Sequence, residues 1–203
     1  MNKVALWSVA ALGVFLVAMV SLFIITSESD FGEKPQRFAD LGGDFTLTSK
    51  EGAVSLSDFE GKVVVMYFGF MTCPEVCPQS MTVISTALSR LKESELASTQ
   101  GVLVSVDPNR DTPEKLKEYT QFYHANLVGL TGTRNDIDNV TQQYGAYYDV
   151  AEIESVTQDY GVEHSSRYYV IDQKGQLVTA MRHSTTPNEL YTQILELLEL
   201  SNY

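Results

Sequence analysis

A run of apolar residues from Val63 to Phe68 (VVVMYF) constrains the fold more than any other feature of the sequence. Its length and its β-favouring residues predict a strand buried on both faces, as in the middle of an α/β sheet. Gly69 loosens the end of the run, and the segment CPEVCP (residues 73–78) follows closely. Apolar residues then recur at helical spacing, which predicts an amphipathic helix from Gln79 to Leu91. The sequence therefore predicts a strand, a turn and a helix in succession.

The turn carries Cys73 and Cys77, the only two cysteines of the chain. Their spacing of four residues puts both side chains on the same side of one helical turn, where they could form a disulfide or bind one metal ion. A helix N-terminus favours the thiolate form, and Pro74 and Pro78 restrict the loop. A purely structural disulfide is the alternative, but so short a loop gains little stability from closure. The pair predicts thiol chemistry or metal binding without deciding between them.

The N-terminal region is a candidate membrane segment. Val4 to Ile25 contains no charged residue and is long enough to cross a bilayer as a helix. Lys3 precedes this segment and acidic residues follow it, so we expect the N-terminus in the cytoplasm and the rest of the chain exported. A cleaved signal peptide is the alternative, but the apolar run is long for one and no small-x-small site lies just past its end. We expect a transmembrane signal anchor at 1–26, a tether at 27–40 and one domain at 41–203.

Composition limits the classes of partner. The 203 residues are 44% hydrophobic, enough for one well-buried domain, and they carry a net charge of -12. This acidic balance disfavours nucleic acids and acidic membrane surfaces as partners, since both attract positive charge. Export would place the two cysteines in an oxidising compartment, where they must be oxidised to each other, kept reduced or protected by a metal.

The remaining elements alternate along the chain. Strands are predicted at 41–47, 54–59, 101–106, 127–130, 168–171 and 177–181, and helices beginning at Thr112, Thr133 and Thr186. Residues 146–153 and 156–162 form a poorly defined, partly extended insertion. This order predicts a thioredoxin-like α/β fold, in which helices cover both faces of a central mixed β-sheet. The cysteine turn would then lie at the C-terminal end of its strand, where open α/β sheets usually hold their sites.

Three histidines are candidates for a third site residue. His164, in the sequence EHSS, lies 87 residues after Cys77, so only the fold could bring the two together. The alternative for His164 is an exposed position in a loop. His124, at the end of a predicted amphipathic helix, and His183, in a polar loop, are weaker candidates.

Three segments together resemble the Sco/SenC family in order, spacing and local sequence. They are VVVMYFGF followed by CPEVCP, then SVDPNRDTPEKL, then GVEHSSRYYVID, and the resemblance runs from about Gly42 to the last helix. It implies a membrane-anchored, thioredoxin-like copper protein that helps to assemble the dinuclear copper centre of cytochrome c oxidase. The implied copper ligands are Cys73, Cys77 and His164. The implied partners are the copper-bearing subunit of the oxidase and another copper carrier or a thiol reductant, with the domain in the periplasm of a bacterial-type inner membrane.

The implied ligand set has a clear chemical preference. Two thiolates and one imidazole suit Cu(I), and Cu(II) could add water or another donor. Zinc is the main rival, but a structural zinc site would want a fourth protein ligand. Met71 and Met81 flank the pair and could add sulfur, although core packing is the commoner fate of methionine.

Two acidic residues, Asp107 and Glu163, lie in the segments that resemble the family. Glu163 stands where many family members have aspartate, and its longer side chain could alter the orientation of the His164 imidazole. Asp107 lies in the segment that resembles the family's second motif and would approach the metal loop. An Asx-type turn before Pro108 is an equally good explanation of Asp107.

Three functions follow from these observations. The first is a copper metallochaperone for oxidase assembly, which is a binding and delivery protein more than an enzyme. The second is a dedicated thiol-disulfide oxidoreductase, with Cys73 and Cys77 as a catalytic redox-active pair that keeps the oxidase cysteines reduced. The third is a redox or copper sensor. The three residues between the cysteines differ from the two of thioredoxins, which argues against a general reductase.

Overall fold

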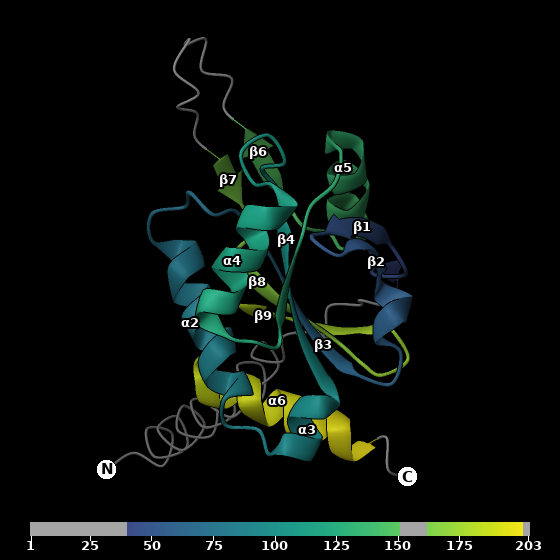
Figure 1. Ribbon diagram of the computed structural model, residues 1–203. Helices are drawn as coiled ribbons and strands as arrows, with labels where there is room; N and C mark the ends of the chain where they lie inside the picture. Colours follow the sequence, from purple (N-terminus) through teal and green to yellow (C-terminus); the bar gives the residue numbers. More distant parts are fainter. Residues whose placement is uncertain (1–39, 151–161, 201–203) are drawn as a thin grey trace, which may run out of the picture. The chain divides into compact units, whose positions relative to one another are not determined.

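The computed structural model describes residues 40–150 and 162–200 (Figure 1). The predicted anchor at 1–26, nearly all of the tether and part of the 146–162 insertion lie outside these residues. Within the two described ranges, no helix has both the length and the apolar character needed to cross a membrane.

The centre of the fold is a five-stranded mixed sheet with the strand order β5-β4-β3-β8-β9. Its middle strand, β3 (Val63–Gly69), pairs in parallel with β4 (Thr99–Ser105) and antiparallel with β8 (Arg167–Ile171). The edges are β5 (Leu127–Leu130) and β9 (Leu177–Arg182). All seven residues of β3 are buried, which confirms the strand that its apolar run predicts. Such a strand is stable only with a layer on each side of the sheet.

Helices supply both layers (Figure 1). On one face, α2 (Val76–Leu88) packs against α4 (Pro113–Tyr123) and α6 (Pro187–Leu200). On the other face, α5 (Arg134–Gln143) ends at Tyr144, whose ring contacts Phe68 of β3. Successive residues of a strand point to opposite faces, so Tyr67 and Gly69 point towards α2. The fold is therefore the thioredoxin-like α/β arrangement that the sequence predicts.

Helix capping explains where several helices begin. Thr112 caps α4 by accepting the Lys115 amide at 3.4 Å, and Pro113 occupies the first position of that helix. Thr133 and Asp136 form a capping box at the start of α5. Both starts are those predicted from the sequence. The short helix α3 (Glu93–Ala97) was not predicted, although Glu95 closes a similar box on the Lys92 amide at 2.8 Å.

The first strands differ from the prediction. β1 (Thr46–Ser49) and β2 (Gly52–Ser55) form a hairpin that overlaps the strands expected at 41–47 and 54–59, but with different bounds. Residues 56–59 form the 3-10 helix η2 (Leu56–Phe59) and not the end of a strand. The reason is local, because the Asp58 carboxylate accepts the Ser55 amide at 2.8 Å and caps this helical turn. In the insertion, β6 (Tyr148–Val150) and β7 (Val162–His164) pair antiparallel, while residues 151–161 lie outside the described part.

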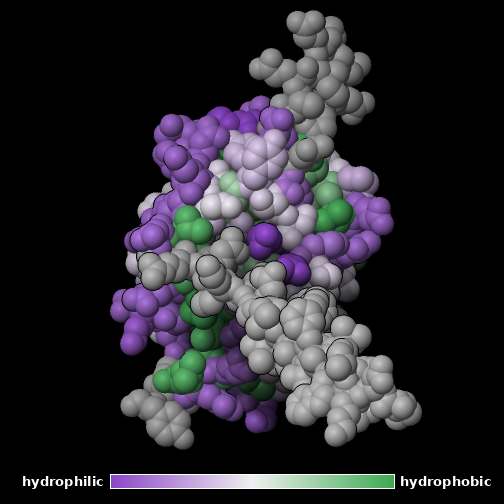
Figure 2. Space-filling model, turned by 180° about the vertical axis from the view of Figure 1, so that it is seen from behind, coloured by the Kyte–Doolittle hydropathy of each residue, from purple (hydrophilic) through white to green (hydrophobic). Residues whose placement is uncertain are grey.

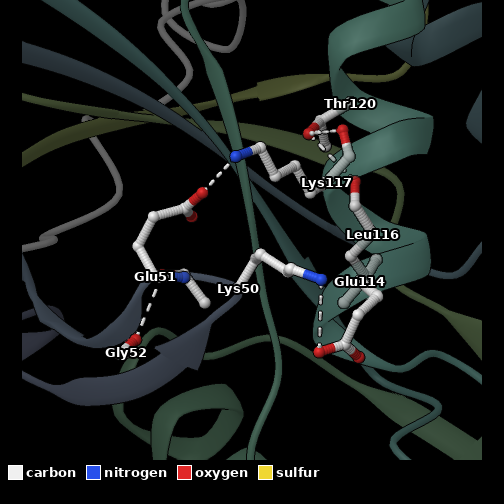
Figure 3. Close-up of polar contacts among 8 residues, drawn as sticks. Lys50, Glu51, Gly52, Glu114, Leu116, Lys117 and Thr120 are labelled. Atoms are coloured by element: carbon white, nitrogen blue, oxygen red, sulfur yellow. Dashed lines mark hydrogen bonds and ion pairs between the residues drawn. The ribbon is translucent and has the colours of Figure 1, made fainter.

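One face of the described domain is mostly polar. Seen from behind, hydrophilic residues cover most of the described face, and hydrophobic residues appear between them in smaller groups (Figure 2). The turn between β1 and β2 is joined to α4 by two ion pairs (Figure 3). Lys50 pairs with Glu114 at 3.7 Å, and Glu51 pairs with Lys117. These side chains are exposed to water, so the ion pairs add little stability.

Leu116 and Lys117 are neighbours on α4 (Figure 3). Leu116 is buried and Lys117 forms an exposed ion pair, so the two positions compare how much each kind of contact contributes to stability. Leu116→Ala should lower the free energy of unfolding by about 2–5 kcal/mol, because it leaves a cavity beneath the helix. Lys117→Ala should cost several times less, since it removes only an exposed contact. Urea unfolding of the metal-free protein measures both values, and equal losses would contradict this account of α4.

Candidate metal centre

Three side chains converge at one end of the central sheet. The Sγ atoms of Cys73 and Cys77 and a ring nitrogen of His164 all lie within 4.8 Å of one another. Cys73 is 8% exposed and Cys77 1% exposed, while His164 is half-buried. Both cysteines are free thiols in this structure. No other group of three or more His, Cys, Asp or Glu side chains in the described ranges has such an arrangement.

The cysteine loop is held by the end of β3 and the start of α2. The Cys73 amide donates to the Phe70 carbonyl at 3.4 Å, and the Cys77 amide donates to Cys73 Sγ at 3.4 Å. Helix α2 begins at Val76 and not at Gln79 as predicted, so Cys77 lies in its first turn and Cys73 precedes it. The prediction that both cysteines share one helical turn is therefore wrong. The Cys73 sulfur instead accepts a backbone N–H of the helix N-terminus.

Sheet pairing brings His164 to this loop. His164 ends β7, and Ser165 and Ser166 connect it to β8, where Tyr168 pairs with Tyr67 of β3. The His164 Nε2 atom lies 3.3 Å from Cys77 Sγ, and its Nδ1 atom lies 3.3 Å from the Ser165 carbonyl. A proton on Nδ1 is donated to that carbonyl, which leaves the Nε2 lone pair available to a metal.

Two aromatic rings fix the plane of the His164 imidazole. The rings of Tyr67 and Phe70 both meet it edge to face, with centroids 5.8 Å and 5.6 Å away. Burial lowers the pKa of His164, although backbone hydrogen bonds with Ser165 and Phe68 oppose the shift. The imidazole is therefore neutral at neutral pH, which is the form that binds metal ions.

Burial also controls the ionisation of Cys77. It raises the pKa of the Cys77 thiol well above its usual range, although the Phe70 backbone amide opposes the shift. The prediction that the helix N-terminus favours a thiolate is therefore wrong for Cys77 in the metal-free protein. Desolvation outweighs the helix dipole because the sulfur is almost completely enclosed. A metal ion would replace the thiol proton, so the site favours a metal over a free thiolate.

The buried carboxylate that supports the metal loop is Asp111, which the sequence analysis missed. Its Oδ2 accepts the Met71 amide at 3.0 Å and the Ser105 hydroxyl at 2.7 Å, so it ties the loop before Cys73 to the end of β4. Asp107 instead forms an ion pair with Arg110, and its carbonyl accepts the Arg110 and Asp111 amides. The feature of the sequence that could have identified Asp111 is its place as the second aspartate of the segment DPNRD (residues 107–111).

The other candidates lie outside the cluster. Met81 is fully buried in the core, and Met71 is partly buried against it. His124 ends α4, where its Nδ1 accepts the Asn126 amide at 3.0 Å. His183 is closer to the site than its sequence suggested, because its Nδ1 lies 3.5 Å from the hydroxyl of Ser80 on α2. Of Glu163 only the backbone is described, opposite Asp149 in the β6–β7 pair.

These features define a thioredoxin-like domain with a Cys-Cys-His site whose two sulfurs and one imidazole nitrogen suit a soft metal ion. Residues 33–199 match the sequence model of the SCO1/SenC family, and the chain belongs to that family. It is 37% identical over 142 residues to the mitochondrial protein SCO2 of Saccharomyces cerevisiae, which covers 70% of this chain and 47% of the yeast protein. It is 36% identical to an SCO2-like protein of Rickettsia prowazekii, over 67% of this chain and 66% of that protein.

Solved structures agree with this assignment. Bradyrhizobium japonicum ScoI with copper bound has a TM-score of 0.70 and 31% identity, over 78% of this chain and 99% of that one. Yeast Sco1 with copper bound has a TM-score of 0.72 and 32% identity, over 81% of this chain and 90% of that one. This chain spans about half of the length of the yeast SCO2 protein.

Gly69 is the position at which the strand and the metal loop come closest. A Cβ atom there would lie 2.9 Å from Cys77 Sγ and 2.8 Å from Tyr67 Cε1, both too close for van der Waals contact. Gly69→Ala should displace the sulfur and weaken Cu(I) binding, in addition to a loss of about 1–3 kcal/mol of stability from overpacking.

Gly101→Ala is the matched control for this prediction. It places a Cβ atom 2.5 Å from Leu127 Cδ2 in another buried strand, away from the metal loop. It should reduce stability but leave the affinity for Cu(I) unchanged, as measured by anaerobic titration. Normal copper affinity in Gly69→Ala would show that the contact with Cys77 is unimportant.

Proposed function

We propose that the protein is a copper-binding metallochaperone that assists assembly of the dinuclear copper centre of cytochrome c oxidase. The main support is that the potential ligand atoms of Cys73, Cys77 and His164 lie within 4.8 Å of one another, although His164 is 87 residues from Cys77 in the sequence. Copper in the solved structures of two family members supports copper as the cargo of this chain.

The donor set explains why copper would be held and still be transferable. Two thiolates and one neutral imidazole match the softness and low coordination number of Cu(I). Binding would release the Cys73 and Cys77 protons, so copper retention would weaken on acidification. The half-buried His164 leaves one side of the site within reach of a partner's ligands. We propose that this partner is the copper-bearing oxidase subunit, with another copper carrier or a thiol reductant supplying the site.

The location is part of the proposal. Residues 1–26 would anchor the chain in a bacterial-type inner membrane as a single pass, with the N-terminus in the cytoplasm. Residues 27–40 would tether the domain at 41–203 in the periplasm. The support is the uncharged segment from Val4 to Ile25, with Lys3 before it and acidic residues after it.

Deletion of residues 1–26 tests the anchor. The full chain should remain in the membrane fraction after an alkaline wash, because an apolar helix holds it in the bilayer. A truncated chain exported with a cleavable signal should be released with the soluble periplasmic proteins. Release of the full chain by the wash would contradict the anchor.

A dedicated thiol-disulfide oxidoreductase is the second candidate function. The supporting observation is that two free thiols lie within 4.8 Å of each other. The raised pKa of Cys77 argues against that residue as the attacking thiolate. A reductase should reduce a disulfide substrate catalytically in the His164→Ala variant, whereas a chaperone needs His164 to hold its cargo.

Anaerobic titration of the reduced full chain in detergent tests the copper site. One Cu(I) per chain should bind tightly, and Cys73→Ser, Cys77→Ser and His164→Ala should each weaken binding by more than about tenfold, because each removes a ligand. His124→Ala is the control, since His124 ends a helix outside the cluster. Equal Cu(I) affinity in His164→Ala and His124→Ala would remove His164 from the site.

A further inference from the structure

The hydroxyl of Tyr67 is buried beside the metal centre without a partner. Tyr67 is 0% exposed, and its hydroxyl oxygen has no hydrogen-bond partner among the described residues. The side chains of Ser80 and Ser166 lie near enough to lower the pKa of Tyr67, but no hydrogen bond of normal length and angle joins either of them to its hydroxyl. A buried hydroxyl without a partner costs stability, and native proteins usually avoid it. The Tyr67 hydroxyl is therefore available to donate a hydrogen bond to an acceptor that forms beside it.

One candidate for such an acceptor is the Cys77 sulfur. Tyr67 and Gly69 point to the same face of β3, and Tyr67 Cε1 and Cys77 Sγ both lie within 2.9 Å of the point where a Gly69 Cβ would be. The Tyr67 ring also meets the His164 imidazole edge to face, with 5.8 Å between centroids. One aromatic side chain therefore lies beside two of the three proposed ligands.

The chemistry of the sulfur changes when copper binds. A cysteine that binds no metal is mostly a thiol near neutral pH, and a thiol is a weak hydrogen-bond acceptor. Copper displaces that proton and leaves a thiolate, which accepts hydrogen bonds much more strongly. Burial and the neighbouring Cys77 raise the pKa of Tyr67, so its hydroxyl keeps the proton that it would donate.

We propose that Tyr67 is a positioning residue of the metal centre, whose hydroxyl donates a hydrogen bond to the Cys77 thiolate when copper is bound. The inference rests on the proposed function, because the copper thiolate exists only when the metal is bound. Hydrogen bonding to a copper thiolate withdraws electron density from sulfur and is one way in which proteins tune copper potentials. Tyr67 would therefore favour Cu(I) over Cu(II) in this site.

Tyr67→Phe removes only the hydroxyl, and Tyr169→Phe is its matched control. Tyr169 is also buried with an unpartnered hydroxyl, but it lies on β8 opposite Met66 and its ring contacts Phe68 and Tyr144, on the other face of the sheet. Both variants should fold, because each loses a buried hydroxyl that makes no hydrogen bond. Thermal unfolding of the metal-free full chain in detergent checks this expectation.

The decisive measurements use the full chain loaded with copper. In Tyr67→Phe, the sulfur-to-Cu(II) charge-transfer band should move to longer wavelength, because the thiolate becomes a better electron donor. The ratio of Cu(I) to Cu(II) affinity should fall about tenfold, which corresponds to a potential lower by about 59 mV. Tyr169→Phe should match the wild type in both measurements.

A second measurement does not depend on either variant. The infrared difference spectrum between the metal-free and Cu(I)-loaded wild type should show one tyrosine C–O stretch shifting, as its hydroxyl gains an acceptor. Absence of that shift, or a Tyr67→Phe variant with the wild-type band and potential, would overturn the inference and leave the proposed function intact. A wild-type chain with no copper-thiolate band would overturn both.

Discussion

The pairing of β3 with β8 is the interaction on which the site depends. β3 carries the cysteine loop at its end, and the antiparallel register of Tyr67 with Tyr168 places the segment before β8 beside that loop. A slip of one residue would turn every side chain of β8 to the opposite face. Complete burial of β3 prevents such a slip, because each of its residues already fills a position in the core. The metal centre is thus a consequence of sheet register.

Burial gives the metal-free centre a consistent electrostatic character. It raises the pKa of Cys77 and lowers that of His164, so the thiol keeps its proton and the imidazole is neutral. The enclosed site avoids an unpaired buried charge until a metal arrives. Desolvation opposes a free thiolate in this site, but a thiolate bound to a metal ion has a positive charge beside it. The site therefore favours the exchange of a thiol proton for a metal ion. The Tyr67 hydroxyl would extend the same logic, as a donor without an acceptor until the thiolate forms.

Local signals in the sequence predicted much of the fold. They gave wrong element bounds where neighbouring residues favour two different structures. The capping residues Thr112 and Thr133 identified the starts of α4 and α5, because capping involves atoms only three residues apart. The same kind of signal at Ser55 and Asp58 was overlooked in favour of alternating hydrophobicity, so a 3-10 helix was read as a strand. The start of α2 was placed too late, because prolines around the cysteines concealed the first turn.

The sequence by itself determined the buried central strand, the cysteine pair in the following turn and the order of the layers. Those features follow from residue type and spacing within one or two elements. Only the tertiary structure decided that His164, and not His124 or His183, reaches the cysteines, and that Asp111 accepts the Met71 amide of the loop. It also decided that burial raises the pKa of Cys77. The reason is physical: contacts and desolvation between distant segments depend on strand pairing and enclosure, which no local pattern encodes.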